Sequence, residues 1–449
     1  MERAKLIVKN FGPLKDIDIE VREMVTFIGA QASGKSTLAK LLSIFEDESF
    51  RRDVSISFED ELKKYNIFSY LKKETFIEYT NYGNVLRLTT PFYLKHSLGV
   101  FVKQTPANLI ELYKEVKNAP TLISNEYGAN EKFKTLIKGS LNYCELYDND
   151  FSKKIYNIFP LKEQKEKFKK LFFNRSKEIL TEKHVDEILS ILGKEQVFES
   201  YLDFYEILVS TFPKIFLYDS IYIPAERNFL HLIAGNTLGL INNNIVIPKH
   251  LLNSGQEYEK AINTITNLSL DIIDKKIKYQ REGNTSYIYH NKNEKINLLE
   301  SASGLQSVIP ILLLIEYSKS LKEEYNFNFV VEEPELNLYP KAQHELIKYL
   351  IKNCLFDRKN LILTTHSPFV LASINNLLLA YDKGQTNPKE VNKIIKKESW
   401  LNPKNFIAYE LKNGKAKKIM NDKLGQISEN MIDSVSDSFA DEFDKLLDL

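Results

Sequence analysis

The sequence is poor in cysteine, and its two cysteines stand far apart. Cys144 and Cys354 are the only ones among 449 residues, with no Cys-x-x-Cys pair and no histidine cluster beside them. This argues against a disulfide scaffold, which needs several pairs of cysteines, and against a zinc site, which needs several ligands at short spacing. Two isolated thiols fit a reducing compartment, so we expect a cytoplasmic protein with passive thiols.

Long hydrophobic runs are also lacking. The longest apolar run covers residues 308–315, well short of the roughly 20 residues that a membrane-spanning helix needs. The first residues carry charges at Glu2, Arg3 and Lys5 and no apolar stretch, which argues against a secretion signal. We therefore expect neither a membrane segment nor export.

There is no excess of charge of one sign. Lysine and arginine total 61 and aspartate and glutamate 60, for a formal net charge of +1. Proteins that coat nucleic acid are usually strongly basic, so any DNA contact must come from a local patch. The most basic segment contains Lys162, Lys165, Lys167, Lys169, Lys170, Arg175 and Lys177. A solvated helix face is favoured there over a contact with a phosphate backbone.

No internal repeat, low-complexity linker or sustained heptad stands out, which argues against a long coiled-coil arm. The chain is too long for one small core. Residues 1–104 and 214–420 contain strand-like segments, whereas residues 105–213 are helix-like and rich in Lys, Glu, Leu, Ile and Phe. We therefore predict an α/β core interrupted by a helical insertion, followed by an acidic helix within residues 421–449.

Short apolar or alternating segments predict the strands of this core. They fall at residues 5–8, 17–21, 24–28, 220–223, 285–289, 327–331 and 360–364. Two further hairpins are expected, at residues 75–88 and at residues 406–420 around an Asn-Gly turn. Because helical segments separate the later strands, the sheet is predicted to be partly parallel.

A complete phosphate-binding loop follows the third predicted strand. Residues 29–37 read Gly-Ala-Gln-Ala-Ser-Gly-Lys-Ser-Thr and match G-x-x-x-x-G-K-[ST]. The loop N–H groups and the start of the next helix attract phosphate, Lys35 neutralises it, and the Ser36 hydroxyl can hold Mg²⁺. We expect this site at a sheet edge. The predicted nucleotide-binding residues are Gly29, Gln31, Ala32, Ser33, Gly34, Lys35, Ser36 and Thr37.

Two carboxylates end the apolar strand at residues 327–331, which is the arrangement of a Walker B element. Glu332 is predicted to order Mg²⁺ with Ser36, and Glu333 to act as general base for water. A solvated turn is the alternative for such a pair when it stands alone. His366 follows the next strand, at the end where α/β sheets bind ligands; it either contacts the γ-phosphate or serves as a structural hydrogen bonder.

Residues 301–307, Ser-Ala-Ser-Gly-Leu-Gln-Ser, open an apolar helix. Such a start has free N–H groups and can bind an anion. An ordinary helix cap is the alternative.

Taken in order, these four elements resemble the ABC-class ATPases of the SMC, RecF and OLD (overcoming lysogenization defect) type. Residues 332–340, Glu-Glu-Pro-Glu-Leu-Asn-Leu-Tyr-Pro, and residues 365–368, Thr-His-Ser-Pro, are most similar to the OLD-like AAA ATPases of bacterial antiphage systems such as PARIS and Septu. The resemblance covers the ATPase parts and leaves out the insertion. It implies an ABC-type P-loop head, with a mixed sheet flanked by helices.

The resemblance also implies how such a protein works. Two protomers would stack head to tail, with Ser303 and Gly304 of one reaching the γ-phosphate held at Lys35 of the other. The loop after the strand at residues 220–223 usually supplies a residue that orients water or metal in this family, and residues 224–227 are the candidate.

Three departures from the family pattern are visible. Ala30, Gln31 and Ala32 replace the usual Pro, Asn and Gly, and Glu332 stands where Asp is commoner. OLD nucleases carry a Toprim domain with an Asp-x-Asp pair, and no such pair occurs after His366. We therefore predict no nuclease in this chain.

These observations predict a Mg²⁺-dependent ATPase that forms a homodimer or larger assembly and regulates a separate effector in antiphage defence. One alternative is a DNA-repair or chromosome-structure ATPase that clamps DNA. Another is an ATP-bound scaffold that cages a toxic partner. The acidic tail carries an apolar stripe that either docks a partner or, as the favoured interpretation, packs on the protein's own sheet.

Overall fold

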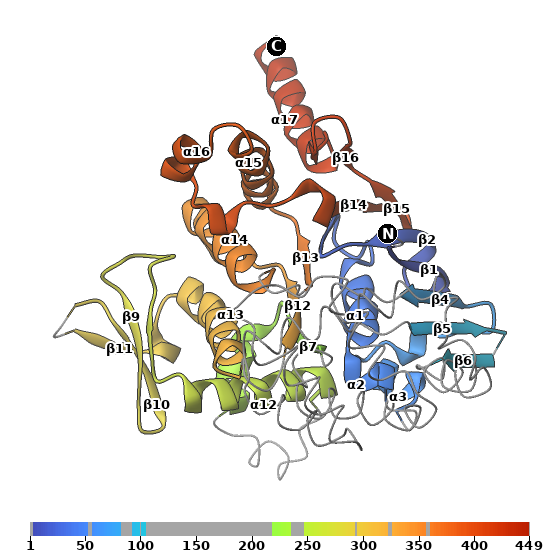
Figure 1. The fold of residues 1–449 in the computed structure, drawn as a ribbon, viewed down its shortest axis with the longest axis horizontal. Helices are drawn as coiled ribbons and strands as arrows, with labels where there is room; N and C mark the ends of the chain where they lie inside the picture. The colour runs from blue at the N-terminus through green and yellow to red at the C-terminus, as the bar shows by residue number, and fades with distance from the viewer. Residues whose placement is uncertain are drawn as a thin grey trace, which may run out of the picture.

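A large mixed sheet organises the computed structural model of the protein, and helices cover both of its faces (Figure 1). The described residues are 3–52, 56–81, 92–98, 100–104, 218–234, 247–291, 294–321, 326–355 and 360–448. The predicted α/β class is confirmed within them. The expected insertion at 105–213, its basic segment and residues 85–88 of one expected hairpin lie outside the described residues.

Within the described residues, eleven strands form this sheet, in the order β6-β5-β4-β1-β2-β15-β14-β3-β13-β12-β7. In chain order their bounds are β1 Ala4–Phe11, β2 Leu14–Val21, β3 Met24–Gly29, β4 Phe76–Asn81, β5 Phe92–Ser97, β6 Val100–Gln104, β7 Tyr218–Ile223, β12 Asn326–Glu332, β13 Leu361–Thr365, β14 Phe406–Lys412 and β15 Lys415–Lys418. The helices are α1 Lys35–Phe45, α2 Glu48–Arg52, α3 Phe58–Lys64, α12 Lys249–Thr264, α13 Ser303–Ser320, α14 Pro340–Cys354, α15 Pro368–Gly384, α16 Pro388–Ile394 and α17 Met431–Leu447.

The sheet is partly parallel, as predicted. β14, β3, β13, β12 and β7 run parallel, while β6, β5, β4, β1 and β2 are antiparallel. The register places Thr365 opposite Ile28 and Glu332 opposite Thr364. The carboxyl ends of β3, β13 and β12 therefore meet along one edge of the parallel half.

The expected sheet-edge position of β3 is wrong. β3 lies between β14 and β13, in the interior of the sheet. Both neighbours come from the last fifth of the chain, so the amino-terminal hairpin alone gave no sign of them. Strands covered on both sides are normally continuous apolar runs, and all six residues of β3 are buried.

Two apolar layers sandwich the sheet. Successive side chains of a strand point to opposite faces, and β12 follows this rule. Phe329 and Val331 pack with α12, α13, α14 and α15, whereas Val330 packs on the other face with α1 and α3. This alternation fixes the end of β12 against both layers, and with it the position of the two carboxylates that follow.

A small antiparallel sheet beside α13 forms a separate lobe, at the left of Figure 1. It contains β8 Asn267–Ser269, β9 Lys278–Glu282, β10 Thr285–Tyr289 and β11 Lys295–Asn297. A third, two-stranded sheet of β16 Met420–Asn421 and β17 Gln426–Ile427 precedes α17. None of the helices within the described ranges is long and apolar enough to cross a bilayer.

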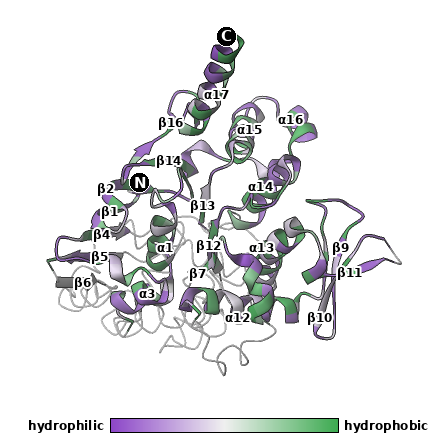
Figure 2. Cartoon of the chain, turned by 180° about the vertical axis from the view of Figure 1, so that it is seen from behind, coloured by the Kyte–Doolittle hydropathy of each residue, from purple (hydrophilic) through white to green (hydrophobic). Residues whose placement is uncertain are grey.

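The favoured interpretation of the acidic tail is wrong. α17 projects away from the rest of the molecule in both views and carries polar and apolar residues along its length (Figures 1 and 2). Among its described side chains, those of the first turn, Met431 and Ile432, are the ones that pack against the core. The apolar stripe is exposed, with Phe439 at 65% and Phe443 at 60%, because α17 leaves the sheet after one turn.

Candidate nucleotide-binding site

The phosphate loop joins β3 to α1 in a conformation that depends on its glycines. Gly34 has φ of +100°, and a Cβ at this position would lie 2.5 Å from Leu14 Cδ2. A Cβ at Gly29 would lie 2.6 Å from the Leu411 carbonyl oxygen. Ala32 also lies in the left-handed region, at φ +59°, which an alanine adopts only at an energetic cost.

Lys35 is positioned inside this loop. Its Nζ donates hydrogen bonds to the carbonyl oxygens of Gly29 and Ala30, both at 2.9 Å. Burial lowers the pKa of Lys35, and the carboxylates of Glu333, Glu332 and Glu335 oppose that change. The ammonium is therefore held between the loop and the acidic strand end, where a phosphate would replace its carbonyl partners.

Glu332 ends β12 in a buried position, 3% exposed. Burial raises the pKa of its carboxyl, against the opposing effects of the Ser36 hydroxyl and the Lys40 ammonium. Glu332 Oε1 has no hydrogen-bond partner within the described structure. The structure thus brings together Ser36 and Glu332, the two residues predicted to hold a metal ion.

Glu333 is held in an unusual backbone conformation, with φ of +42°. Its N–H donates to the Thr364 carbonyl oxygen at 2.9 Å, and its own carbonyl accepts from Arg227 Nη2 at 2.7 Å. Its carboxylate Oε1 lies 3.2 Å from His366 Nε2. Non-glycine residues in this region are typical of functional sites, where the surroundings maintain the strain.

Glu335 connects this loop to the end of β13. Its Oε1 accepts hydrogen bonds from Thr365 Oγ1 at 2.7 Å and from the His366 N–H at 2.8 Å. Burial raises the pKa of the Glu335 carboxyl. No role was predicted for Glu335 from the sequence, although a third acid in a Glu-Glu-x-Glu run was a usable signal.

The serine–glycine turn lies at the start of α13, next to the loop that follows Glu333. Ser303 is exposed, and no side chain caps the helix start. A Cβ at Gly304 would lie 2.6 Å from the Asn337 carbonyl oxygen, so only glycine allows this close approach. The turn therefore presents backbone N–H groups and the Ser303 hydroxyl at the surface.

Residues 224–227, expected to orient water or metal, contain one side chain with a different role. Arg227 begins a 3-10 helix, η5 (Arg227–Phe229), and is fully buried. Its guanidinium bonds to main-chain carbonyls, among them those of Glu332 and Glu333. In the same turn, the Glu226 carboxylate lies close enough to Glu332 for its negative charge to raise the pKa of the Glu332 carboxyl.

The residues at this edge fit a nucleotide and its cation. Three buried polar atoms without a partner in the described structure belong to the phosphate loop and to the acidic segment after β12, namely Ser33 Oγ, Glu332 Oε1 and Glu335 Oε2. Buried polar atoms are almost always hydrogen-bonded, so such a cluster indicates a ligand site. No group of three or more metal-ligating side chains occurs in the described ranges. Ser36 and Glu332 together offer two oxygen ligands, and Mg²⁺ usually takes one or two protein ligands and completes its shell with phosphate and water.

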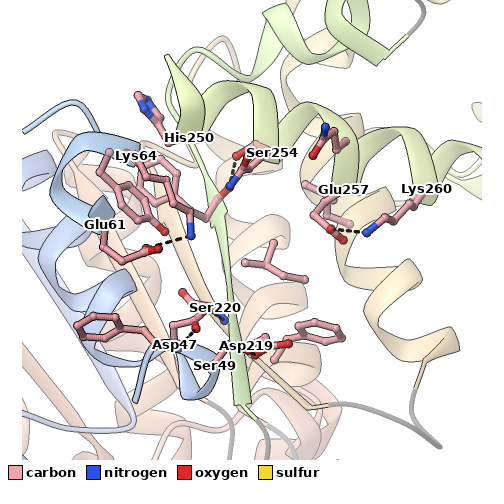
Figure 3. A pocket seen from close by; sticks show the side chains of 18 of the residues that line it. Asp47, Ser49, Glu61, Lys64, Asp219, Ser220, His250, Ser254, Glu257 and Lys260 are labelled. Carbon is pink, nitrogen blue, oxygen red and sulfur yellow. Dashed lines mark hydrogen bonds and ion pairs between the residues drawn. The ribbon is translucent and has the colours of Figure 1, made fainter. Parts of the chain in front are cut away.

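A cavity of about 580 Å³ lies between α3, β7 and α12, away from the phosphate loop (Figure 3). Asp47 and Asp219 line it together. Burial, and then the Asp219 charge, raise the pKa of Asp47 from its ordinary 3.8 to about 6. Asp47 accepts hydrogen bonds from the N–H groups of Phe50 and Ser220, which is a structural role.

Comparison with known proteins agrees with this geometry. The family model described as AAA ATPase domain matches residues 1–371, a span that includes the phosphate loop, the acidic pair and His366. No curated protein matches the chain.

Similar solved structures include SMC head domains. The Pyrococcus furiosus head bound to the C-terminal domain of ScpA has 11% identity and a TM-score of 0.34, over 92% of this chain and 95% of that one. The Thermotoga maritima head has 10% identity and a TM-score of 0.36, over 93% and 98%. The Pyrococcus yayanosii head has 9% identity and a TM-score of 0.38, over 94% and 97%.

Proposed function

The chain belongs to the AAA ATPase domain family and is an ATPase, and from that premise we propose that ATP acts as a switch which pairs two copies of it head to tail. The observation that carries this proposal is the exposed start of α13. Ser303 is exposed and no side chain caps the start of α13, and a helix start of this kind binds anions. In a pair, it would cap the γ-phosphate held by the partner.

Each catalytic group of one subunit has a role that follows from its position. Lys35 and the loop N–H groups bind the phosphates, and Ser36 with Glu332 holds Mg²⁺, which when bound neutralises charge on the phosphates. Glu333 takes the proton from the attacking water. His366, 3.2 Å from the Glu333 carboxylate, orients that carboxylate and contacts the γ-phosphate.

Exposed apolar side chains on the segments that carry these groups support a paired state. They are Phe229 and Leu232 after Arg227, Leu299 before the serine–glycine turn, Tyr339 after Glu335, and Phe369 after His366. Aromatic side chains are enriched in protein interfaces, and exposed apolar patches often mark them. Pairing would remove them from water together with the nucleotide.

The test is Glu333→Gln. Without the base, turnover should fall by about 100-fold or more, while ATP binding persists and the pair accumulates, as measured by analytical ultracentrifugation with ATP and Mg²⁺. Lys35→Ala and Ser303→Arg are the controls, and neither should form the pair. Unaltered turnover in Glu333→Gln would refute the assignment of the base. A monomer with ATP bound would refute the switch.

The sequence resemblance at residues 332–340 and 365–368 supports a finer proposal, that the switch regulates a separate effector in antiphage defence. α17 is the candidate docking element. The exposed polar face is acidic, with Asp433, Asp437, Asp441, Glu442 and Asp444 on the same helix as the apolar stripe. The occupant we propose is an effector with an apolar groove rimmed by lysine or arginine. A second copy of α17 would place acidic side chains against acidic side chains, which repel.

ATP-dependent, salt-sensitive retention of DNA by the purified protein would instead favour a DNA clamp.

A further inference from the structure

Arg227 forms an unusual set of contacts for a buried cation. Its Nε donates to the Ser307 carbonyl oxygen at 2.9 Å, and its Nη1 to those of Glu332 at 2.8 Å and Pro224 at 3.2 Å. Its Nη2 donates to the Glu333 carbonyl oxygen at 2.7 Å. One rigid, planar group thus joins three segments: its own turn, the first turns of α13 and the strand end that carries the base.

The side chain remains a cation despite its burial. Burial lowers the pKa of Arg227 to about 10, and the carboxylates of Glu335, Glu333, Glu332 and Glu226 oppose that change. A charged group buried this completely is costly unless its donors are satisfied. Here carbonyl oxygens from distant parts of the chain satisfy them, so their relative positions are fixed by the guanidinium.

His231, four residues after Arg227, contacts another main-chain carbonyl of α13, that of Gln306. Pro310 lies inside α13 and has no N–H, so the carbonyl of Gln306 lacks its helical donor. His231 Nε2 lies 2.7 Å from that oxygen and Nδ1 lies 2.8 Å from the Tyr258 hydroxyl. Because a carbonyl only accepts, Nε2 carries the proton. His231 therefore fixes α13 but has no contact with Glu332 or Glu333 among those described.

We propose that Arg227 is a positioning residue that couples the two nucleotide sites to which each subunit contributes. The coupling rests on the head-to-tail pairing proposed above. In that arrangement α13 caps the partner's nucleotide, whereas Glu333 acts on the subunit's own. Engagement of the α13 start would be transmitted through the Ser307 carbonyl and the guanidinium to the strained backbone of Glu333. Hydrolysis at one site then depends on occupancy of the other.

The first test is Arg227→Lys, which keeps the charge but cannot span the same carbonyls. We expect kcat to fall about 10- to 100-fold, because the base is misplaced, with KM for ATP within about threefold of wild type. The matched control is Arg22→Lys. Arg22 also donates to main-chain carbonyls, those of Pro403 and Phe406, and it lies at the opposite end of β3. The Arg22→Lys variant should therefore keep the wild-type kcat. A wild-type kcat in Arg227→Lys would overturn the proposal.

The second test uses isolated mixed pairs, and its first arm needs no Arg227 variant. A Ser303→Arg subunit lacks the cap at both sites when it meets its own kind, but keeps one complete site with wild type. The two kinds of subunit carry different tags, and pairs that hold both tags are isolated with ATP. Independent sites would leave such a pair about half of the wild-type activity, whereas full coupling would leave almost none. In an Arg227→Lys background the mixed pairs should keep about half of that variant's own activity. About half with wild type would overturn the coupling.

The two proposals fail in different ways. If Glu333→Gln forms no pair with ATP, the head-to-tail switch is wrong and the coupling falls with it. If that pair forms and mixing leaves half of the activity, the switch stands and only the coupling is refuted. His231→Asn, which loosens α13 alone, should weaken pair formation more than it lowers kcat in the pairs that form.

Discussion

Glu333 shows how a single residue is prepared for its role. Its left-handed backbone is held from both sides, at the N–H by Thr364 and at the carbonyl by Arg227, and its carboxylate meets His366. The cost of such a conformation is about 1–3 kcal/mol, which two hydrogen bonds to well-packed elements can maintain. From the sequence, Glu333 was predicted as the base and His366 as a contact of the γ-phosphate, whereas the strain and the contact between the two residues are visible only in the structure.

Ala32 offers a test at the same scale. The family pattern has glycine here, and alanine at φ +59° carries a left-handed strain of about 1–2 kcal/mol. Ala32→Gly removes this strain but adds flexibility to the unfolded chain, so we expect unfolding free energy to rise by at most about 1 kcal/mol. Urea unfolding measures it. ATP binding should be retained, and a clear loss of stability would contradict the strain.

At the scale of elements, a buried carboxyl at the junction of α1, α2 and β7 makes the free energy of unfolding depend on pH. Asp47 lies there with a pKa raised to about 6 beside Asp219. Between about pH 4 and 6 the folded protein therefore holds a proton that the unfolded chain has released. The contribution of Asp47 to the free energy of unfolding therefore falls as pH rises through this window and is constant above it. A rise from 3.8 to about 6 corresponds to about 3 kcal/mol at most.

Asp219→Asn tests this cost. The substitution keeps an acceptor for the Ser49 hydroxyl but removes the neighbouring charge, so the pKa of Asp47 should drop and less stability be lost between pH 4 and 7. Chemical unfolding at a series of pH values measures it. Asp271→Asn is the matched control, since Asp271 also accepts from a serine hydroxyl, that of Ser269, at an exposed position. An equal pH profile in both variants would contradict the assignment.

At the scale of the whole molecule, most of α17 should contribute little to folding and serve instead to bind a partner. Phe443 and Phe439 are exposed, so replacing both by serine should change unfolding free energy by less than about 0.5 kcal/mol each and leave ATP turnover intact. Ile432, which packs on the core, is the contrasting site, and Ile432→Ala should destabilise. Co-expression with each neighbouring gene product, followed by co-purification, tests docking. Undiminished capture of the effector by the serine variant would exclude α17 as its binding element.

The amino-acid sequence by itself determined the α/β class and the strands of the parallel half of the sheet, and it predicted the site residues. Apolar runs report burial, and a phosphate loop, an acidic pair or a strand-end histidine is a local pattern whose chemistry needs fixed residue types at fixed spacing. These features need only neighbours in the chain. For the same reason the expected position of β3 in the sheet and the favoured surroundings of α17 were both wrong.

Only the tertiary structure decided which distant segments meet. Arg227 reaches carbonyls 80, 105 and 106 residues away, and β13 and β14 insert on either side of β3. Periodicity shows that a residue is buried but not against what, because many strand orders bury the same apolar faces equally well. The contacts that link α13 to Glu333 therefore follow from the packing of the complete sheet and its two helical layers.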